Sequence, residues 1–178
     1  LRLIAGANNF AAEYKLGANQ AFETPHFIYT YSEKGKNQAS INMHRWSRKY
    51  RIHDGEGNRL TLLNNWEATQ FNFNEKKIIT LLDEAKEIGL DAFLLDDGWF
   101  GNKYPRNNDN AGLGDWEVNQ NKLPNGLSNL IKKANKRGVK FGIWIEPEMV
   151  NPKSELYQNH LDWVIRQPNR KEYYYRNQ

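Results

Sequence analysis

The feature that most constrains the fold is a regular alternation of short apolar runs and amphipathic segments that begins at Leu60. Apolar runs occupy residues 60–66, 91–97 and 139–146, and segments with helical periodicity lie between them at residues 74–88 and 123–138. Each segment repeats its apolar residues at i, i+3, i+4 and i+7, as amphipathic helices do: Ile78, Leu81, Leu82 and Ala85, then Leu127, Leu130, Ile131 and Ala134. The order strand–helix–strand–helix–strand predicts parallel βαβ units.

Local signals support the boundaries of these helices. Asn74 can cap the start of the first, and Gly89 and Gly138 can end the first and the second. Residues 153–165 form a weaker third helical segment.

Polar and aromatic residues gather where each predicted strand ends. Asn64, Asn65 and Trp66 follow the first strand, Asp96 and Asp97 the second, and the run WIEPE, residues 144–148, the third. Functional groups on successive strand ends are typical of the C-terminal face of a (β/α)8 barrel. No glycine-rich phosphate loop follows the first strand, which argues against a dinucleotide-binding sheet.

The chain before Leu60 has a different pattern. Residues 1–40 alternate apolar and polar residues between turn signals, which predicts the last strands of an all-β region, and residues 45–59 read as a polar connector. A complete barrel needs about 250 residues, and only about 120 follow Leu60. We therefore expect a fragment that starts inside one domain and ends inside another.

Composition excludes several classes of function. The net charge is +4 and the basic residues are scattered, so a nucleic-acid binder is not expected. There is no cysteine, which excludes disulfides and thiolate metal sites. No apolar run approaches the roughly 20 residues of a membrane span. The chain opens on Leu1 rather than Met, so its start says nothing about targeting. The four histidines lack metal-ligand spacing, so we expect no metal site, and no serine lies in a nucleophile elbow.

Three groups of residues could carry chemistry. Asp96 and Asp97 would repel each other unless ligand hydroxyls or a cation satisfy them; the alternative is that one caps the Gly98 turn and the other pairs with a Lys or Arg. Glu146 could act with Asp97 as a glycosidase pair, or it could be salt-bridged beside Pro147. The tryptophans at strand ends could stack on a sugar or pack the core; they are Trp66, Trp99, Trp116 and Trp144.

Taken in order, several motifs resemble the α-galactosidases of glycoside hydrolase family 36. They are NNWEATQFNFNEKK, LLDDGWFG, LGDWEVNQNKLPNGL, FGIWIEPEMVNP, HLDWVI and YRNQ. The resemblance implies that residues 1–44 end an N-terminal β-sandwich domain and that residues 45–178 begin a (β/α)8 catalytic barrel. It also implies a retaining hydrolase that releases terminal α-galactose from melibiose- and raffinose-type sugars without a cofactor.

The same resemblance implies site residues. The nucleophile and the acid/base would lie beyond Gln178, so no residue of this chain is assigned to catalysis. Asp96 and Asp97 would accept hydrogen bonds from the galactose O4 and O6 hydroxyls, with Trp66, Trp144 and Arg176 in the same pocket. Secondary candidates for this pocket are Trp99, Trp116 and Glu146.

Some alternatives stay open. An α-N-acetylgalactosaminidase, a galactosyl-transferring relative and a non-catalytic sugar-binding remnant all fit the residues. The loop after the second strand, residues 102–116, is longer than expected for the family, which leaves the aglycone side undefined. The resemblance also suggests a cytoplasmic homotetramer that binds galactose-containing oligosaccharides, with no nucleic-acid or membrane partner.

Overall fold

A computed structural model describes residues 2–8, 10, 13–166 and 169. The chain divides into two compact units, Leu1–Asn58 and Arg59–Gln178. No helix among the described residues is long and apolar enough to cross a membrane.

The first unit differs from its prediction. Its described residues contain no β-strand, so the prediction of strands in residues 1–40 was wrong. Helix α1 (Gly35–Tyr50) covers the end of that region and the start of the predicted connector, so the prediction of a connector was wrong there too. No residue of this helix is fully buried, and its most apolar side, with Ala39, Met43 and Trp46, is half-buried. The proposed domain boundary between residues 44 and 45 falls inside α1 and stays a prediction about the family's domains.

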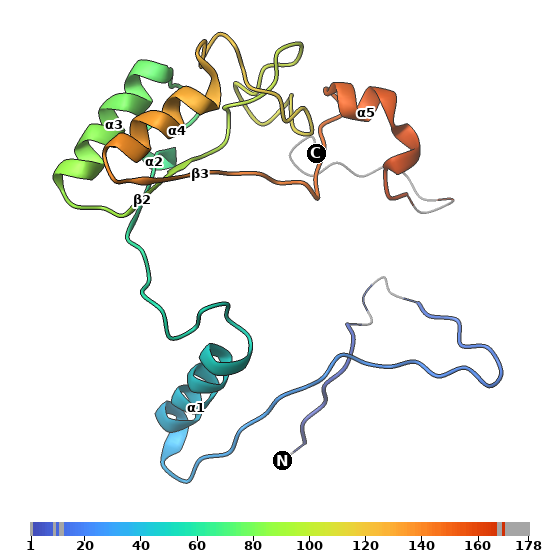
Figure 1. Ribbon diagram of the computed structural model, residues 1–178. Helices are drawn as coiled ribbons and strands as arrows, with labels where there is room; N and C mark the ends of the chain where they lie inside the picture. Colours follow the sequence, from blue (N-terminus) through green and yellow to red (C-terminus); the bar gives the residue numbers. More distant parts are fainter. Residues whose placement is uncertain (1, 9, 11–12, 167–168, 170–178) are drawn as a thin grey trace. The chain divides into compact units, whose positions relative to one another are not determined.

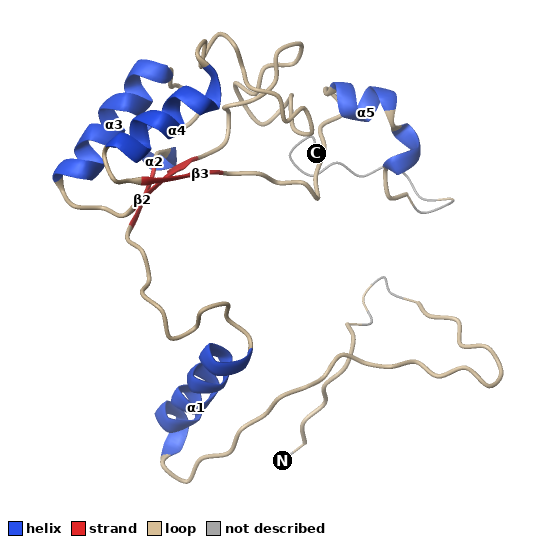
Figure 2. Ribbon diagram, in the orientation of Figure 1, coloured by secondary structure: helices blue, strands red, loops and turns tan. Residues whose placement is uncertain are grey.

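The second unit contains the predicted parallel βαβ arrangement. Strands β1 (Leu62–Asn64), β2 (Ala92–Leu95) and β3 (Lys140–Ile143) form one parallel sheet in chain order. Helices α3 (Glu75–Glu87) and α4 (Gly126–Lys136) connect them and lie side by side over the same face of the sheet (Figures 1 and 2). Consecutive strands with both helices on one face are the repeating arrangement of a barrel, whereas a doubly wound sheet has helices on both faces.

The predicted start and end of α3 are confirmed. The Asn74 side chain accepts a hydrogen bond of 3.0 Å from the backbone N–H of Lys77, and Gly89 follows the helix with a φ of 78°. Ile78, Leu82 and Ala85 are fully buried, as the amphipathic pattern requires.

The later helices follow the prediction in part. In α4, Leu130 and Ala134 are fully buried, but Ile131 is 40% exposed although the pattern placed it on the apolar face. The weak third segment forms two short helices, α5 (Glu155–Asn159) and the 3-10 helix η1 (Leu161–Trp163). The short helix α2 (Trp66–Thr69), which follows β1, was not predicted.

The sheet brings the three strand ends to one edge. Phe93 and Phe141 are register partners on β2 and β3, and their rings stack 5.8 Å apart. Their neighbours Leu94 and Gly142 also pair, and a Cβ on Gly142 would lie 3.2 Å from the Leu94 side chain, so the missing side chain makes room for the leucine. Because all three strands run parallel, the residues after Asn64, Leu95 and Ile143 meet at the carboxyl edge of the sheet.

Candidate functional site

A cavity of about 480 Å³ lies at the carboxyl edge of the sheet. Every strand contributes to its wall through residues at its end or just after it. The lining residues are Asn64, Trp66, Glu67, Asp96, Asp97, Arg106, Asp109, Trp144 and Glu146. Five carboxylates and one guanidinium therefore face this space among the described residues, so the wall is rich in hydrogen-bond acceptors.

Asp96 is held by the two asparagines that end β1. The Asn64 amide donates to Asp96 Oδ2, while the Asn65 side-chain oxygen accepts from the backbone N–H of Asp96 at 2.8 Å. The other carboxylate oxygen, Oδ1, accepts from the backbone N–H of Asp97 at 2.7 Å. Asp96 is half-buried, so its carboxylate has a fixed orientation and still lines the cavity.

Asp97 is buried and forms an ion pair with Arg106. Arg106 Nε lies 3.0 Å and 3.1 Å from the two Asp97 oxygens, and Nη2 lies 2.9 Å from Oδ2. The two side chains are 8% and 1% exposed. The structural alternative, in which one aspartate pairs with a Lys or Arg, is therefore correct for Asp97. Asp97 also lines the cavity, so this ion pair does not remove it from the site.

Burial and Arg106 have opposite effects on the charge of Asp97. Burial raises the pKa of the Asp97 carboxyl from its ordinary value, because a carboxylate loses hydration there. The hydrogen bonds and the positive charge of Arg106 lower the pKa, but burial outweighs them and the net shift is upward. Asp97 is therefore a carboxylate whose ionised form depends on its partner.

The turn after Asp97 is fixed by a glycine and a lysine. Gly98 has a φ of 99°, and a Cβ there would come within 3.0 Å of the Phe71 ring. The Lys122 ammonium donates to the carbonyl oxygens of Phe71 at 3.0 Å, Gly98 at 2.8 Å and Arg106 at 3.2 Å. Lys122 thus joins the loops that follow β1 and β2.

The four candidate tryptophans separate into two pairs. Trp66 and Trp144 are half-buried and line the cavity. Trp99 is 3% exposed in the core and donates from its indole N–H to the Trp144 carbonyl oxygen at 3.0 Å. Trp116 packs against Trp99 and Trp144, with ring centroids 6.3 Å and 6.2 Å away. Neither Trp99 nor Trp116 lines the cavity, and Trp99 supports the backbone of a residue that does.

The remaining candidates are placed as follows. Glu146 is half-buried and lines the cavity with Asp96 and Asp97. Arg176 lies outside the described residues. No cluster of three potential metal ligands occurs among the described residues. The structure thus brings together five of the predicted residues, which are Asp96, Asp97, Trp66, Trp144 and Glu146. What these residues bind stays a prediction.

Sequence reasoning missed Arg106, Asp109 and Glu67, which also line the cavity. Arg106 and Asp109 lie in a long loop without periodicity, so no pattern marks them. The only available signal was the requirement that two adjacent acids at a buried strand end have a cation nearby. That requirement predicts a partner but does not say which of the many basic residues it is.

Comparison with known proteins adds a family. A profile of the melibiase family matches residues 21–178. The α-galactosidase AgaA of Geobacillus stearothermophilus is 45% identical over 180 residues, which cover 99% of this chain and 24% of the relative. The α-galactosidase Mel36A of Lactobacillus acidophilus is 43% identical over 175 residues, which cover 97% of this chain and 24% of the relative.

Solved structures give the same relatives. A crystal structure of a variant of the glycoside hydrolase family 36 α-galactosidase AgaA in complex with raffinose matches with a TM-score of 0.73 and 47% identity, over 79% of this chain and 20% of that chain. A variant in complex with 1-deoxygalactonojirimycin matches with a TM-score of 0.77, over 83% and 20%. The chain thus spans about a quarter of the length of these curated relatives.

Proposed function

The chain belongs to the melibiase family, and from this premise we propose that the protein containing it is an α-galactosidase. It hydrolyses terminal, non-reducing α-galactose from oligosaccharides of the melibiose and raffinose type. The residues described above form the part of its active site that recognises galactose. The observation that carries the proposal is the pair of adjacent, oriented carboxylates in a cavity whose wall also contains two indoles.

The chemistry of the cavity fits a neutral sugar. Carboxylates accept hydrogen bonds from hydroxyl groups, and the faces of Trp66 and Trp144 offer apolar surface to the C–H face of a pyranose. A volume of about 480 Å³ is within the range of small-ligand sites. Because galactose differs from glucose in its axial O4, an acceptor fixed on that hydroxyl rejects the wrong epimer.

The proposed reaction retains the anomeric configuration and uses two carboxylates. We assign neither to Asp97: its ion pair with Arg106 suits it to accept hydrogen bonds rather than to attack carbon. The nucleophile and the acid/base belong, in this proposal, to parts of the protein outside these 178 residues. Arg176 is proposed as a further sugar contact on the resemblance alone.

The architecture of the whole protein is part of the same proposal. The three parallel strands with helices on one face support the first third of a (β/α)8 barrel. We propose that residues 1–44 end a β-sandwich domain that precedes this barrel. Large apolar side chains of this segment are exposed, including Leu3, Ile4 and Tyr29, and they would be covered in a complete domain. A homotetramer in the cytoplasm is proposed from the family resemblance only.

Kinetics of the complete protein test the proposal. We expect hydrolysis of an aryl α-galactoside and of raffinose, little hydrolysis of the matching α-glucoside, and release of α-galactose as the first anomer seen by NMR. Equal rates on the two aryl glycosides would contradict galactose recognition at this site. Preference for the α-N-acetylgalactosaminide would instead establish the related activity, and release of β-galactose would refute the retaining mechanism.

A further inference from the structure

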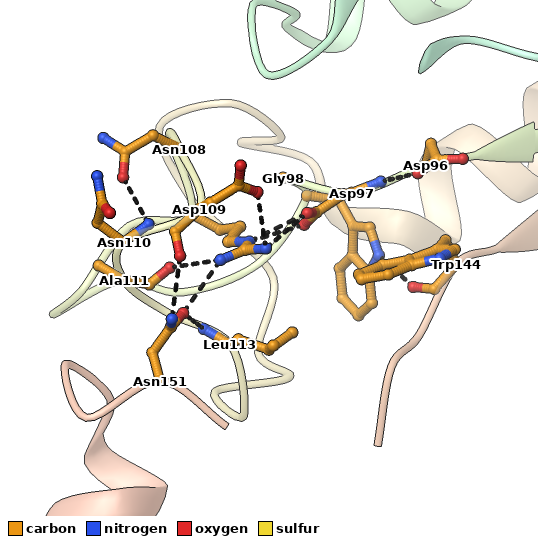
Figure 3. A network of polar contacts seen from close by, with 12 residues as sticks. Asp96, Asp97, Gly98, Asn108, Asp109, Asn110, Ala111, Leu113, Trp144 and Asn151 are labelled. Carbon is orange, nitrogen blue, oxygen red and sulfur yellow. Dashed lines mark hydrogen bonds and ion pairs between the residues drawn. The ribbon is translucent and has the colours of Figure 1, made fainter. Parts of the chain in front are cut away.

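Arg106 is the largest fully buried side chain among the described residues, and it lies at the wall of the cavity rather than in the apolar core. Each nitrogen of its guanidinium makes hydrogen bonds. Nε and Nη2 donate to Asp97, and Nη2 also donates to Asp109 Oδ1 at 3.4 Å (Figure 3). Nη1 donates to Asn151 Oδ1 at 3.0 Å and to the Ala111 carbonyl oxygen at 3.4 Å. Hydrogen bonds therefore hold all three nitrogens of the guanidinium.

A contribution to stability does not by itself explain this arrangement. The desolvation of two buried charges offsets most of their attraction, so a buried ion pair is often no more stabilising than an apolar pair of the same size. What the pair supplies is a buried carboxylate with a positive charge beside it that lowers its pKa against the effect of burial, next to the space where a ligand would bind. An apolar residue in place of Arg106 could not supply this.

The pairing also fixes the plane of the carboxylate. Arg106 approaches Asp97 from the side, with Nε and Nη2 together spanning both oxygens. A carboxylate has about four lone-pair positions, and the planar guanidinium fork occupies those on one side. Asp97 lines the cavity, so the acceptor capacity that the guanidinium leaves is next to the space where sugar hydroxyls could donate. A lysine at residue 106 would supply the charge without this planar match.

The position of the guanidinium is set by residues from another loop. Asn151 is fully buried after β3; its Oδ1 accepts from Arg106 and from the Leu113 N–H at 2.9 Å, and its Nδ2 donates to the Asp109 carbonyl oxygen at 3.0 Å. Figure 3 shows Asn151 beside the Asp109–Leu113 segment, with dashed lines that mark its hydrogen bonds there. The loop after β3 thus determines where Arg106 lies.

We propose that Arg106 is a positioning residue of the sugar site, which acts through Asp97 by holding both carboxylate oxygens so that their free lone pairs point at the ligand's hydroxyls. This inference rests on the proposed function, because the ligand it names is the galactose residue. The orientation is transmitted from β3 to β2 through Asn151 and Arg106.

Kinetics with deoxy sugars separate positioning from folding. In the complete protein, Arg106→Lys keeps the charge and loses the planar fork; we expect kcat/KM on an aryl α-galactoside to fall at least about tenfold, as for a lost charge-assisted hydrogen bond. The ratio of kcat/KM on the full galactoside to kcat/KM on its 4-deoxy or 6-deoxy analogue should be smaller in this variant than in the wild-type protein. A purely structural defect lowers the amount of active enzyme for all substrates equally and leaves their ratio unchanged.

The matched control is Lys103→Met. Lys103 is a basic residue of the same loop, and its ion pair with Glu155 is exposed. We expect the kinetics and the deoxy-sugar ratios of this variant to equal those of the wild-type protein. Deoxy-sugar ratios in Arg106→Lys that equal those of the wild type would overturn the proposal.

A titration of Asp97 needs no substrate and separates this proposal from the proposed function. In aspartate-¹³C-labelled complete protein, with Asp97→Asn used to assign the signal, Arg106→Met should move the Asp97 titration to higher pH, because the charge that lowers the pKa is lost. An unchanged titration would overturn the role of Arg106. Absence of galactosidase activity in the wild-type protein would overturn the proposed function and leave the titration result standing. If Arg106→Met does not fold, Arg106→Lys supplies the decisive comparison through its deoxy-sugar ratios.

Discussion

At the residue scale, adjacent acids with different neighbours have different properties. Asp96 is half-buried and bound by neutral amide groups, whereas Asp97 is buried and bound by a guanidinium. The sequence predicted that the two carboxylates would require compensating partners, and it placed both at a strand end. It could not identify Arg106 or Asn151, because a tertiary contact from an aperiodic loop leaves no pattern in the sequence.

Lys122 gives a prediction about pH. Burial lowers the pKa of Lys122 from 10.5 to about 8, because a buried ammonium loses hydration. Between these pH values the folded chain has released this proton and the unfolded chain has kept it. The unfolded state then binds more protons, so the free energy of unfolding contributed by Lys122 rises with pH across this window.

The measurement is the difference in unfolding free energy between the wild-type protein and Lys122→Met, followed from pH 7 to about 11 in the complete protein. Methionine is of similar length and does not titrate. The difference should move in favour of the wild type as the pH rises from about 8 to about 10.5. A difference that stays constant, or moves the other way, would show that Lys122 keeps its ordinary pKa.

At the element scale, the helices that cover the sheet were the most predictable part of the molecule. Their period, the Asn74 cap and the Gly89 stop are local properties of the chain, and the structure confirms all three for α3. Helix α1 was missed although Ala39, Met43, Trp46 and Tyr50 recur at helical spacing, because polar and charged residues dominate this segment and it was interpreted as the end of a strand region and a connector.

Two neighbouring leucines of α3 test the packing of this helix. Leu82 is fully buried and Leu81 is only half-buried. We expect Leu82→Ala to cost about 2–5 kcal/mol, because it removes atoms and leaves a cavity, and Leu81→Ala to cost clearly less. Native-state hydrogen exchange of the α3 and α4 amides in the complete protein measures both changes locally. Equal acceleration of exchange in the two variants would contradict the orientation of α3.

At the scale of the whole molecule, the fold class was predictable because βαβ order, strand-end clusters and right-handed connections leave few topologies. The absence of strands in the described part of residues 1–34 was not predictable. Alternating apolar and polar residues suit a strand, but a strand also requires hydrogen-bond partners, which an alternation pattern does not identify.

The open sheet gives a prediction about the 178-residue chain by itself. Strands β1 and β3 each have a neighbour on one side only within the described sheet, and Leu62 and Ile145 near them are 52% and 53% exposed. Unpaired strand edges and exposed apolar side chains promote association. We expect the isolated chain to bind a hydrophobic dye and to form larger species with rising concentration in light scattering, whereas the complete protein should not bind the dye. A monodisperse, dye-negative 178-residue chain would contradict this.

The central claim is that the Asp96–Asp97 edge recognises the galactose hydroxyls, and a cycle that pairs a protein change with a substrate change tests it most directly. We would measure kcat/KM of the complete protein and of Asp97→Asn on aryl α-galactoside and on its 4-deoxy and 6-deoxy analogues, with Asp96→Asn alongside. We expect Asp97→Asn to lose at least ~2 kcal/mol of transition-state binding on the full sugar and much less on the analogue that lacks the partner hydroxyl. Equal losses on all three substrates, or no loss on any, would contradict it.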